Sequence, residues 1–381
     1  MSTDELPDDY IGLSLVEKKE YVDTLDSEVN ELSKMLNEIR ANSPKNLLSK
    51  TNSPFIRYPP GYKFKSSAPM KIQKQKILTM CTFYQGTDRN VSVATASQDG
   101  TAVCWDASGL KYEAFRIGKG NLMSVSANQS GRVLATGGLN CALDFYSIGE
   151  ELKRLSADPE PPFAFPKQTI VDTEYGRPAQ FRLTLAGPTS AVTGLAFLDD
   201  VKIVSGSQDG GINVFDISEA VKIMDFQEQV PINHIDNGTE YVFCSAGQDG
   251  YLKVWDIRRK HEEVISINTS TPLSKALFMS EGHSIMTSAL NNLFLMDLRS
   301  SSTLETYQSN LGIVSDFSIS KSGRLAVCGF DSGIIHSLDV LENRWVNLID
   351  NRKDVISGVS IIEDKVFCSS WDGLLKSYSP E

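Results

Sequence analysis

The chain has 381 residues, 41% hydrophobic and 22% charged, and is therefore long enough to bury a large core. Its formal net charge of −11 argues against nucleic acid as the main ligand. No apolar run approaches the roughly 20 residues of a membrane-spanning helix, and the acidic start lacks the apolar centre of a signal peptide, so we expect a cytoplasmic protein.

The N-terminal region predicts a disordered acidic segment over residues 1–14 and a coiled-coil helix over residues 15–42. The helix is predicted from apolar residues spaced alternately three and four apart, the a/d pattern of a coiled coil. These residues are Val22, Leu25, Val29, Leu32, Leu36 and Ile39. A lone helix cannot bury such a stripe, so we expect it to pair with a second chain; docking back onto the remainder of its own chain is the alternative.

A basic, proline-containing linker is predicted over residues 43–69. No acidic residue occurs from Ala41 to Thr87, whereas lysines and arginines recur throughout that stretch. Such a run is either a solvated linker or a segment that faces an anionic membrane surface.

A repeated phrase organises the rest of the chain. Ser97-Gln98-Asp99-Gly100, followed by Trp105-Asp106, is one of seven clear or weaker copies of the same phrase. The turns of the seven copies lie at Asp99, Asn140, Asp209, Asp249, Leu290, Ser332 and Asp372. Five of the six intervals between them are 40 to 42 residues, the period of one β-propeller blade.

Each repeat contains short β-rich runs, such as Val192 to Phe197, Lys202 to Gly206 and Ile212 to Ile217. Asp-Gly predicts a tight primed turn between strands, and the Trp of Trp-Asp is expected to fill the wedge between blades. We therefore predict an all-β fold over residues 70–381, a seven-bladed WD-repeat β-propeller preceded by the N-terminal coiled-coil α-helix. A strand near Met70 to Lys76 is expected to pair with the last three strands and close the ring.

The long interval between the second and third turns predicts a loop insertion at residues 149–180. Asp158-Pro159-Glu160-Pro161-Pro162 and Pro166 disfavour a regular strand there. The insertion is either tolerated without a role or is a contact for a partner.

Signs of catalysis are missing from the sequence. His234, His261, His283 and His336 lie in different repeats, without a metal-ligand spacing. Gly118-Lys119-Gly120 lacks the spacing of a phosphate-binding loop, and the repeat aspartates have a fixed place in each turn. We expect a non-catalytic protein without a metal or cofactor.

Several local phrases resemble the β subunit of heterotrimeric G proteins. They include Gly137-Gly138-Leu139-Asn140, Phe197-Leu198-Asp199-Asp200, Ser320-Lys321-Ser322-Gly323-Arg324-Leu325 and Ser369-Ser370-Trp371-Asp372-Gly373. The order of heptad helix, basic linker and seven repeats is also similar. Ala107-Ser108-Gly109-Leu110-Lys111 and the terminal Ser-Pro are most similar to the fungal mating-pathway members, which implies a role in pheromone response.

This resemblance implies that the helix holds a small γ subunit, and that the narrow propeller face binds GDP-loaded Gα and downstream effectors. The residues that match that face are Met123, Leu139, Asp249 and Trp371. A lipidated γ subunit would attach the protein to the cytoplasmic face of the plasma membrane. A buried blade-core tryptophan is the alternative for Trp371. The alternative function is a WD-repeat scaffold, such as a corepressor or ubiquitin-ligase adaptor, with a self-associating helix.

The chain also departs from the family's pattern. Cys81, Asn121 and Ala191 align where the family has aromatic anchors, and Val230 and Pro272 align where it has carboxylates. The Gly-His dipeptide that opens typical repeats is absent, with Gly187-Pro188 as its nearest remnant. We therefore expect altered Gα binding, whereas the pattern for γ binding is intact.

Overall fold

The computed structural model describes the propeller region with several gaps. The described residues are 64–66, 70–71, 75–85, 90–106, 111–116, 121–148, 177–178, 180–259, 263–351, 353–362 and 365–380. They contain strands, turns and loops but no helix. The predicted coiled-coil helix at residues 15–42 lies outside them.

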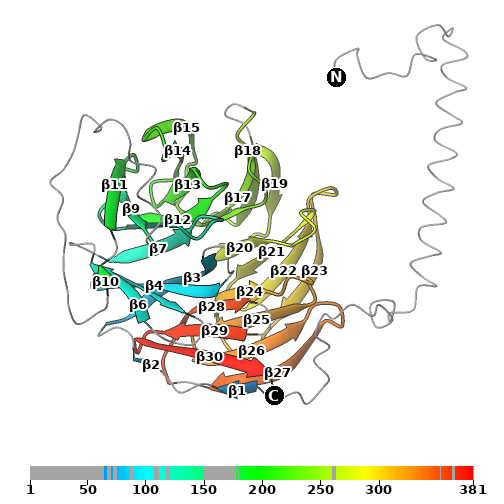
Figure 1. The fold of residues 1–381 in the computed structure, drawn as a ribbon. Coiled ribbons are helices and arrows are strands. Elements are labelled where there is room, and N and C mark those ends of the chain that lie inside the picture. The colour runs from blue at the N-terminus through cyan, green and yellow to red at the C-terminus, as the bar shows by residue number, and fades with distance from the viewer. Residues whose placement is uncertain are drawn as a thin grey trace, which may run out of the picture. The chain divides into compact units, whose positions relative to one another are not determined.

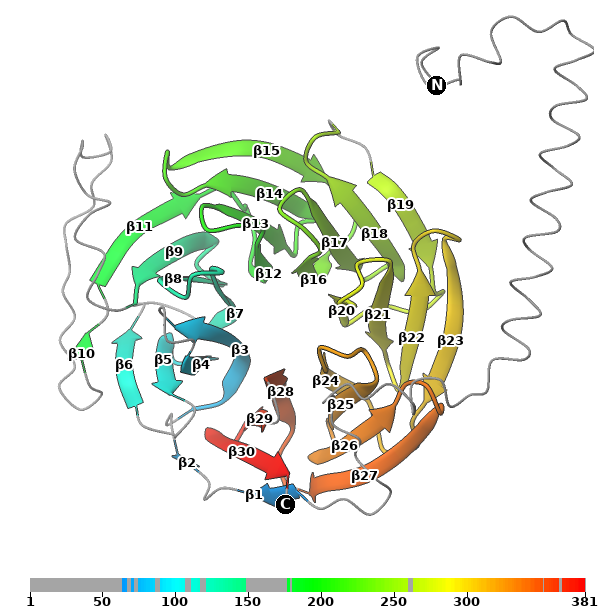
Figure 2. The same cartoon turned by 45° about the vertical axis from the view of Figure 1, so that its right-hand side comes forward.

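Seven sheets follow one another around a ring, so the predicted seven-bladed β-propeller is confirmed (Figures 1 and 2). We number the sheets as blades 1 to 7 in chain order. The innermost strands of the blades surround a central channel, each beside the innermost strands of its two neighbours (Figure 2).

The first three blades take the following strands. Blade 1 contains β3 (Ile77–Gln85), β4 (Asn90–Ser97), β5 (Thr101–Asp106), β6 (Lys111–Arg116) and the short β10 (Arg177–Pro178). Blade 2 contains β7 (Leu122–Ala127), β8 (Val133–Gly138), β9 (Ala142–Ser147) and β11 (Gln180–Ala186). Blade 3 contains β12 (Val192–Phe197), β13 (Lys202–Ser207), β14 (Gly211–Asp216) and β15 (Val221–Gln227).

The other four blades complete the ring. Blade 4 contains β16 (Ile232–Asn237), β17 (Val242–Gly247), β18 (Tyr251–Asp256) and β19 (Glu263–Asn268). Blade 5 contains β20 (Lys275–Phe278), β21 (Ser284–Ala289), β22 (Asn292–Asp297) and β23 (Ser302–Gln308). Blade 6 contains β24 (Val314–Ile319), β25 (Leu325–Phe330), β26 (Ile334–Asp339) and β27 (Arg344–Asn351), and blade 7 contains β28 (Ile356–Ile362), β29 (Lys365–Ser370) and β30 (Leu374–Pro380).

Blade 7 is completed by strands from the other end of the chain. β1 (Phe64–Ser66) pairs antiparallel with β30, with Phe64 opposite Pro380, and β2 (Met70–Lys71) pairs with the first part of β30. The expected closing pairing is therefore present, and it begins at Phe64, upstream of Met70. This closure leaves no free edge on β30 at these residues.

Large buried side chains fill the wedges between blades, as the Trp-Asp pattern predicts. Trp255 of blade 4 packs against Phe226 of blade 3, with 4.8 Å between ring centroids, in a cluster of residues from both blades. Trp105 of blade 1 lies in a cluster with Phe367 and Leu375 of blade 7. Each wedge buries apolar area from two sheets, which holds neighbouring blades together.

The turns of the clear repeats differ from the predicted two-residue primed turn. β4 ends at Ser97 and β5 begins at Thr101, and the Gly100 N–H donates to the Ser97 carbonyl at 3.2 Å. A positive φ of 79° occurs at Gly100 but not at Asp99. This is a three-residue loop, a turn followed by a left-handed residue, and glycine there avoids the clash that a Cβ would cause.

The predicted insertion is described at its end alone. Arg177–Pro178 forms β10, which runs parallel to β6, so a short strand does occur within the segment expected to be a loop. The rest of the segment up to residue 176 lies outside the described residues.

Candidate functional site: the turn face of the propeller

One face of the ring carries the turns between the second and third strands of each blade, together with the loops that lead into the innermost strands. We call it the turn face. One hydrogen bond recurs on it in blades 1, 2, 3, 4, 6 and 7. The first residue of the turn donates its N–H to the carbonyl just before the innermost strand, as Trp371 does to Val355 at 3.0 Å. Each of these turns is therefore held in a fixed position.

The first turn residue is exposed in every blade. These residues are Gln98, Leu139, Gln208, Gln248, Leu290, Asp331 and Trp371. Three of them are large and apolar, which is unusual for a position that is exposed in every blade. Leu139 and Trp371, both predicted site residues, therefore occupy the same place in blades 2 and 7.

Trp371 lies on the surface and not in the blade core. Its side chain is 39% exposed, and the Lys76 ammonium lies 4.1 Å from the centroid of its ring. The backbone carbonyl of Lys76 also accepts the Gln98 N–H of blade 1, at 2.9 Å. The cation covers part of the ring across the junction of blades 7 and 1, and the alternative of a buried core tryptophan is wrong.

Met123 is the second residue of β7, at a β-bulge. At the equivalent bulges Asn233 donates to the Leu273 carbonyl at 2.7 Å, and Ser315 to the Ile356 carbonyl at 2.5 Å, each in the next blade. The Met123 side chain offers no such donor. It presents half-buried apolar surface in the same blade as Leu139.

Asp249 is exposed but occupies the second turn position rather than the first. Its Oδ1 accepts the Tyr251 N–H at 3.0 Å, as Asp99 Oδ1 accepts the Thr101 N–H at 3.0 Å. The repeat aspartates thus shape the turns, and Gln248 is the blade 4 residue that corresponds to Trp371.

Asp209 shows how strongly hydrogen bonds can stabilise the ionised carboxylate of a turn aspartate. Burial favours its neutral form, but hydrogen bonds from Ser207, Thr189 and the Gly211 N–H outweigh burial and lower the pKa of Asp209 to about 2. Thr189 follows the Gly187-Pro188 remnant and supplies both its hydroxyl and its N–H to the carboxylate. Thr189 therefore supplies hydrogen bonds to the turn aspartate in a repeat that lacks the Gly-His dipeptide.

Two further apolar side chains lie together on the turn face and were not predicted. Leu290 and Ile313 are 48% and 47% exposed, and the carbonyl of Leu290 accepts the Val314 N–H at 2.8 Å. Leu290 also has a positive φ of 51°. The repeat at Leu290-Asn291 lacks Asp-Gly, so its residues carry little signal for the geometry of this turn.

The residues that align with the family's aromatic anchors and carboxylates lie at different positions in the fold. Asn121 and Ala191 stand just before innermost strands, and their carbonyls accept the Leu139 N–H at 3.1 Å and the Gln208 N–H at 3.0 Å. Cys81 lies in the middle of β3 rather than at that place, and burial raises the pKa of its thiol to about 12. Val230 is half-buried and Pro272 is exposed, both in loops of the turn face.

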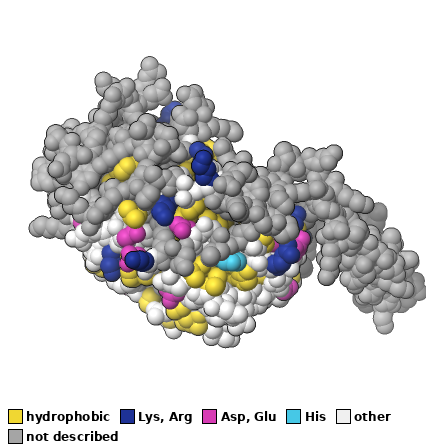
Figure 3. Space-filling model, turned by 90° about the horizontal axis from the view of Figure 1, so that it is seen from below, with side chains coloured by type: hydrophobic (Ala, Val, Ile, Leu, Met, Phe, Trp, Pro, Cys, Tyr) yellow, Lys and Arg dark blue, Asp and Glu magenta, His cyan; other side chains and the backbone are white. Residues whose placement is uncertain are grey.

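The six residues of the heptad seam lie outside the described residues. Within the described ranges, no group of three or more His, Cys, Asp or Glu side chains is arranged to hold a metal ion. In the same ranges, no helix is long and apolar enough to cross a membrane. On the face drawn in Figure 3, described basic and acidic side chains lie beside one another among hydrophobic ones.

Comparison with known proteins adds to this geometry. Residues 179–216, which span β11 to β14, match the family model "WD domain, G-beta repeat". This chain is a WD-repeat β-propeller protein. The WD-repeat chain is 25% identical to the guanine nucleotide-binding protein subunit beta of Saccharomyces cerevisiae over 341 residues, which cover 76% of this chain and 74% of the relative.

Two other relatives share shorter parts of the WD-repeat chain. It is 25% identical to WD repeat-containing protein 55 of Arabidopsis thaliana, over 47% of this chain and 53% of that protein. It is 31% identical to the ribosome biogenesis protein WDR12 homolog of Aedes aegypti, over 33% of this chain and 29% of that protein.

Proposed function

We propose that this WD-repeat protein is a divergent β subunit of a heterotrimeric G protein. The proposal is carried by the similarity to the yeast β subunit, which extends over 76% of the chain. In this proposal the helix at residues 15–42 holds a γ subunit, and the turn face binds GDP-loaded Gα. Release from Gα would then free the same face for effectors of a receptor pathway, such as the pheromone response.

The turn face supports a protein-binding role through its exposed apolar side chains. Trp371 in blade 7 and Leu139 in blade 2 are exposed in turns that are each held by a backbone hydrogen bond, and Met123 adds half-buried apolar area in blade 2. Because the backbone of each turn is already held, a partner that covers it has less backbone entropy to immobilise. Tryptophan is also among the residues most often found to dominate binding energy.

The chemistry of this face differs from the family's in blades 3 and 4. Ala191 is buried, and Val230 contributes no charge. We therefore place the proposed contact with Gα on blades 7 and 2, and we expect a weaker contribution from blades 3 and 4.

The proposal also covers localisation and chemistry. The protein would act without catalysis and would lie at the cytoplasmic face of the plasma membrane, held there by a lipid on γ. Its net charge of −11 fits a protein that does not bind nucleic acid as its main ligand.

A second candidate function is a scaffold in another complex, with a helix that pairs with a second copy of itself. The similarity to WD repeat-containing protein 55 and to the ribosome biogenesis protein favours it, because neither is described as a G-protein subunit. The two candidates differ in what the heptad helix binds.

The test is the native mass of the purified protein, alone and co-expressed with candidate γ subunits. We expect a one-to-one complex with a small lipidated chain; a homo-oligomer that ignores those chains would favour the scaffold. Replacing Leu25, Val29 and Leu32 together by Asp should abolish recovery of the small chain, because charges in an a/d seam prevent helix pairing.

The matched control carries the same three added carboxylates outside the seam, at Thr24, Ser27 and Asn30. This control should recover the small chain as well as the unmodified protein does. Equal recovery by the seam variant would show that the helix does not hold the partner.

A further inference from the structure

The innermost strands are fastened to one another by side chains. An N–H group that points from an innermost strand toward the neighbouring blade has no strand partner, so it needs another acceptor. Asp236 Oδ2 of β16 accepts the Phe278 N–H of β20 at 2.8 Å, and Asp316 Oδ2 of β24 accepts the Val359 N–H of β28 at 2.6 Å. We call each such junction between neighbouring innermost strands a strand joint.

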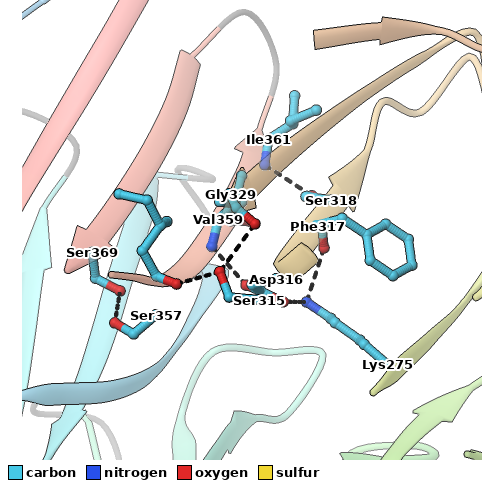
Figure 4. Close-up of polar contacts among 12 residues, drawn as sticks. Lys275, Ser315, Asp316, Phe317, Ser318, Gly329, Ser357, Val359, Ile361 and Ser369 are labelled. Carbon is cyan, nitrogen blue, oxygen red and sulfur yellow. Dashed lines mark hydrogen bonds and ion pairs between the residues drawn. The ribbon is translucent and has the colours of Figure 1, made fainter. Parts of the chain in front are cut away.

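At the joints between blades 5, 6 and 7, the carboxylate of Asp316 is paired with the ammonium of Lys275 (Figure 4). The Lys275 ammonium donates to Asp316 Oδ1 at 2.6 Å and to the Phe317 carbonyl at 2.9 Å. Ser318 adds a neutral contact, because its Oγ accepts the Ile361 N–H at 3.0 Å. The buried charge on Asp316 is therefore paired, as a buried charge must be to avoid a large desolvation cost.

The joint between blades 4 and 5 uses the same kind of contact without that balance. Asp236 borders the central channel, a cavity of about 490 Å³ that Lys275 and Asp316 also line. Among the described residues no basic group forms an ion pair with Asp236, because the ammonium of Lys275 is engaged by Asp316. Burial raises the pKa of Asp236 to about 6, and the Phe278 N–H and Lys275 limit the rise.

The other titratable groups that face Asp236 lie on β16, β17 and β20. On β16 itself, burial lowers the pKa of His234 to about 3, and on β17 burial raises the pKa of the Cys244 thiol. Lys275 faces it from β20, and β12 carries no titratable residue. At neutral pH both His234 and Cys244 are therefore neutral, and neither supplies a cation to the Asp236 carboxylate.

We propose that the joint between blades 4 and 5 is a pH-responsive element of the ring, in which the desolvation of one uncompensated carboxylate destabilises the joint at neutral pH. The joints between blades 5, 6 and 7 do not share this response, because Lys275 balances Asp316. A carboxyl whose folded pKa is raised stabilises the fold fully below its ordinary pKa of about 4. That contribution is lost as the pH rises through about 6.

His234 acts in the opposite direction, since unfolding lets its imidazole take up a proton below its ordinary pKa of about 6.5. The pH profile of the unmodified protein contains both effects. A variant at Asp236 isolates the joint, because His234 is then the same in both proteins compared.

The experiment compares Asp236→Asn with Asp316→Asn in the full chain, by thermal unfolding at pH 7.5 and pH 5. In Asp236→Asn the new amide oxygen still accepts the Phe278 N–H but carries no charge, so we expect the melting temperature to rise by about 2–6 °C at pH 7.5. This gain should shrink strongly at pH 5. Asp316→Asn should instead lower the melting temperature at both pH values, because it leaves the Lys275 ammonium without its anion.

Hydrogen exchange locates the effect. At pH 7.5 the β20 amides should exchange about tenfold more slowly in Asp236→Asn than in the unmodified chain, whereas β28 amides should change little. A lower or unchanged melting temperature for Asp236→Asn at pH 7.5, a failure of that variant to fold, or a gain of the same size at pH 5 would each overturn the proposal.

Discussion

Two tryptophans, each followed by aspartate, lie in regions of the propeller with opposite roles. Trp255 lies near the end of a third strand, is 3% exposed, and donates its indole N–H to Ser245 Oγ at 2.9 Å in the wedge between blades 3 and 4. Trp371 begins a turn and is 39% exposed on the turn face. The same dipeptide therefore marks the core in one register of the repeat and the surface in another.

The largest effect should come from the wedge. Trp255→Ala removes a side chain packed against Phe226 and Phe243 and leaves a cavity that two sheets cannot close. We expect a loss of about 3–5 kcal/mol in the free energy of unfolding, which chemical denaturation would measure. A loss below about 1 kcal/mol would mean that the wedge does not depend on this ring.

The turn face should behave in the opposite way. Trp371→Ala should change stability by less than about 1 kcal/mol, because the ring is partly exposed and its main contact is the Lys76 ammonium. Under the proposed function it should weaken binding to GDP-loaded Gα by about 2–4 kcal/mol, or roughly 30- to 1000-fold. Calorimetric melting and titration of the same sample separate the two quantities.

Either of two results would break the contrast between the tryptophans. Undiminished affinity in a folded Trp371→Ala variant would remove this ring from the binding surface. A drop in melting temperature as large as that of Trp255→Ala would show that the turn face contributes to the core.

The smallest effect sharpens the comparison within the turn face. Leu290 has a φ of 51°, where a Cβ is strained by about 1–2 kcal/mol, whereas Leu139 at the corresponding turn position has no positive φ. Leu290→Gly should relieve that strain and, after the entropy gained by the unfolded chain, raise stability by up to about 1 kcal/mol. Thermal unfolding provides the check.

Leu139→Gly is the matched control and should lower stability by about 0.5–1 kcal/mol, since it adds the same freedom to the unfolded chain without relieving strain. If both variants shift the melting temperature in the same direction, backbone strain does not distinguish the two turns.

The blades could be predicted from sequence because their signals are local and repeat. The expected strand from Val192 to Phe197 coincides with β12, and the turn positions identify all seven blades. The turn type was predicted wrongly, because Asp-Gly suits both a two-residue primed turn and the observed three-residue loop. A separate comparison of the turn phrases could have shown that Gln248, not Asp249, corresponds to Leu139 and Trp371.

The strand joints could not be predicted, because they connect residues of different repeats. Asp236 and Phe278 are 42 residues apart, and their contact depends on the β-bulge that sets the register of β16. A sequence pattern indicates that a strand exists more reliably than it indicates the register. The exposed Leu290 and Ile313 were missed for a related reason, since the repeat to which Leu290 belongs lacks the Asp-Gly phrase.

The closure of blade 7 has a consequence for biosynthesis. β1 and β2 emerge from the ribosome early, yet their partner β30 follows all the other strands that the structure describes. Blades 1 to 6 need no strand from the other end of the chain and can form in order during translation. Until blade 7 forms, the ring stays open and the apolar faces of blades 1 and 6 that pack on blade 7 stay uncovered. The open intermediate is therefore prone to aggregate through these apolar faces until β30 is synthesised, and chaperones that shield apolar surface should act on it during that interval.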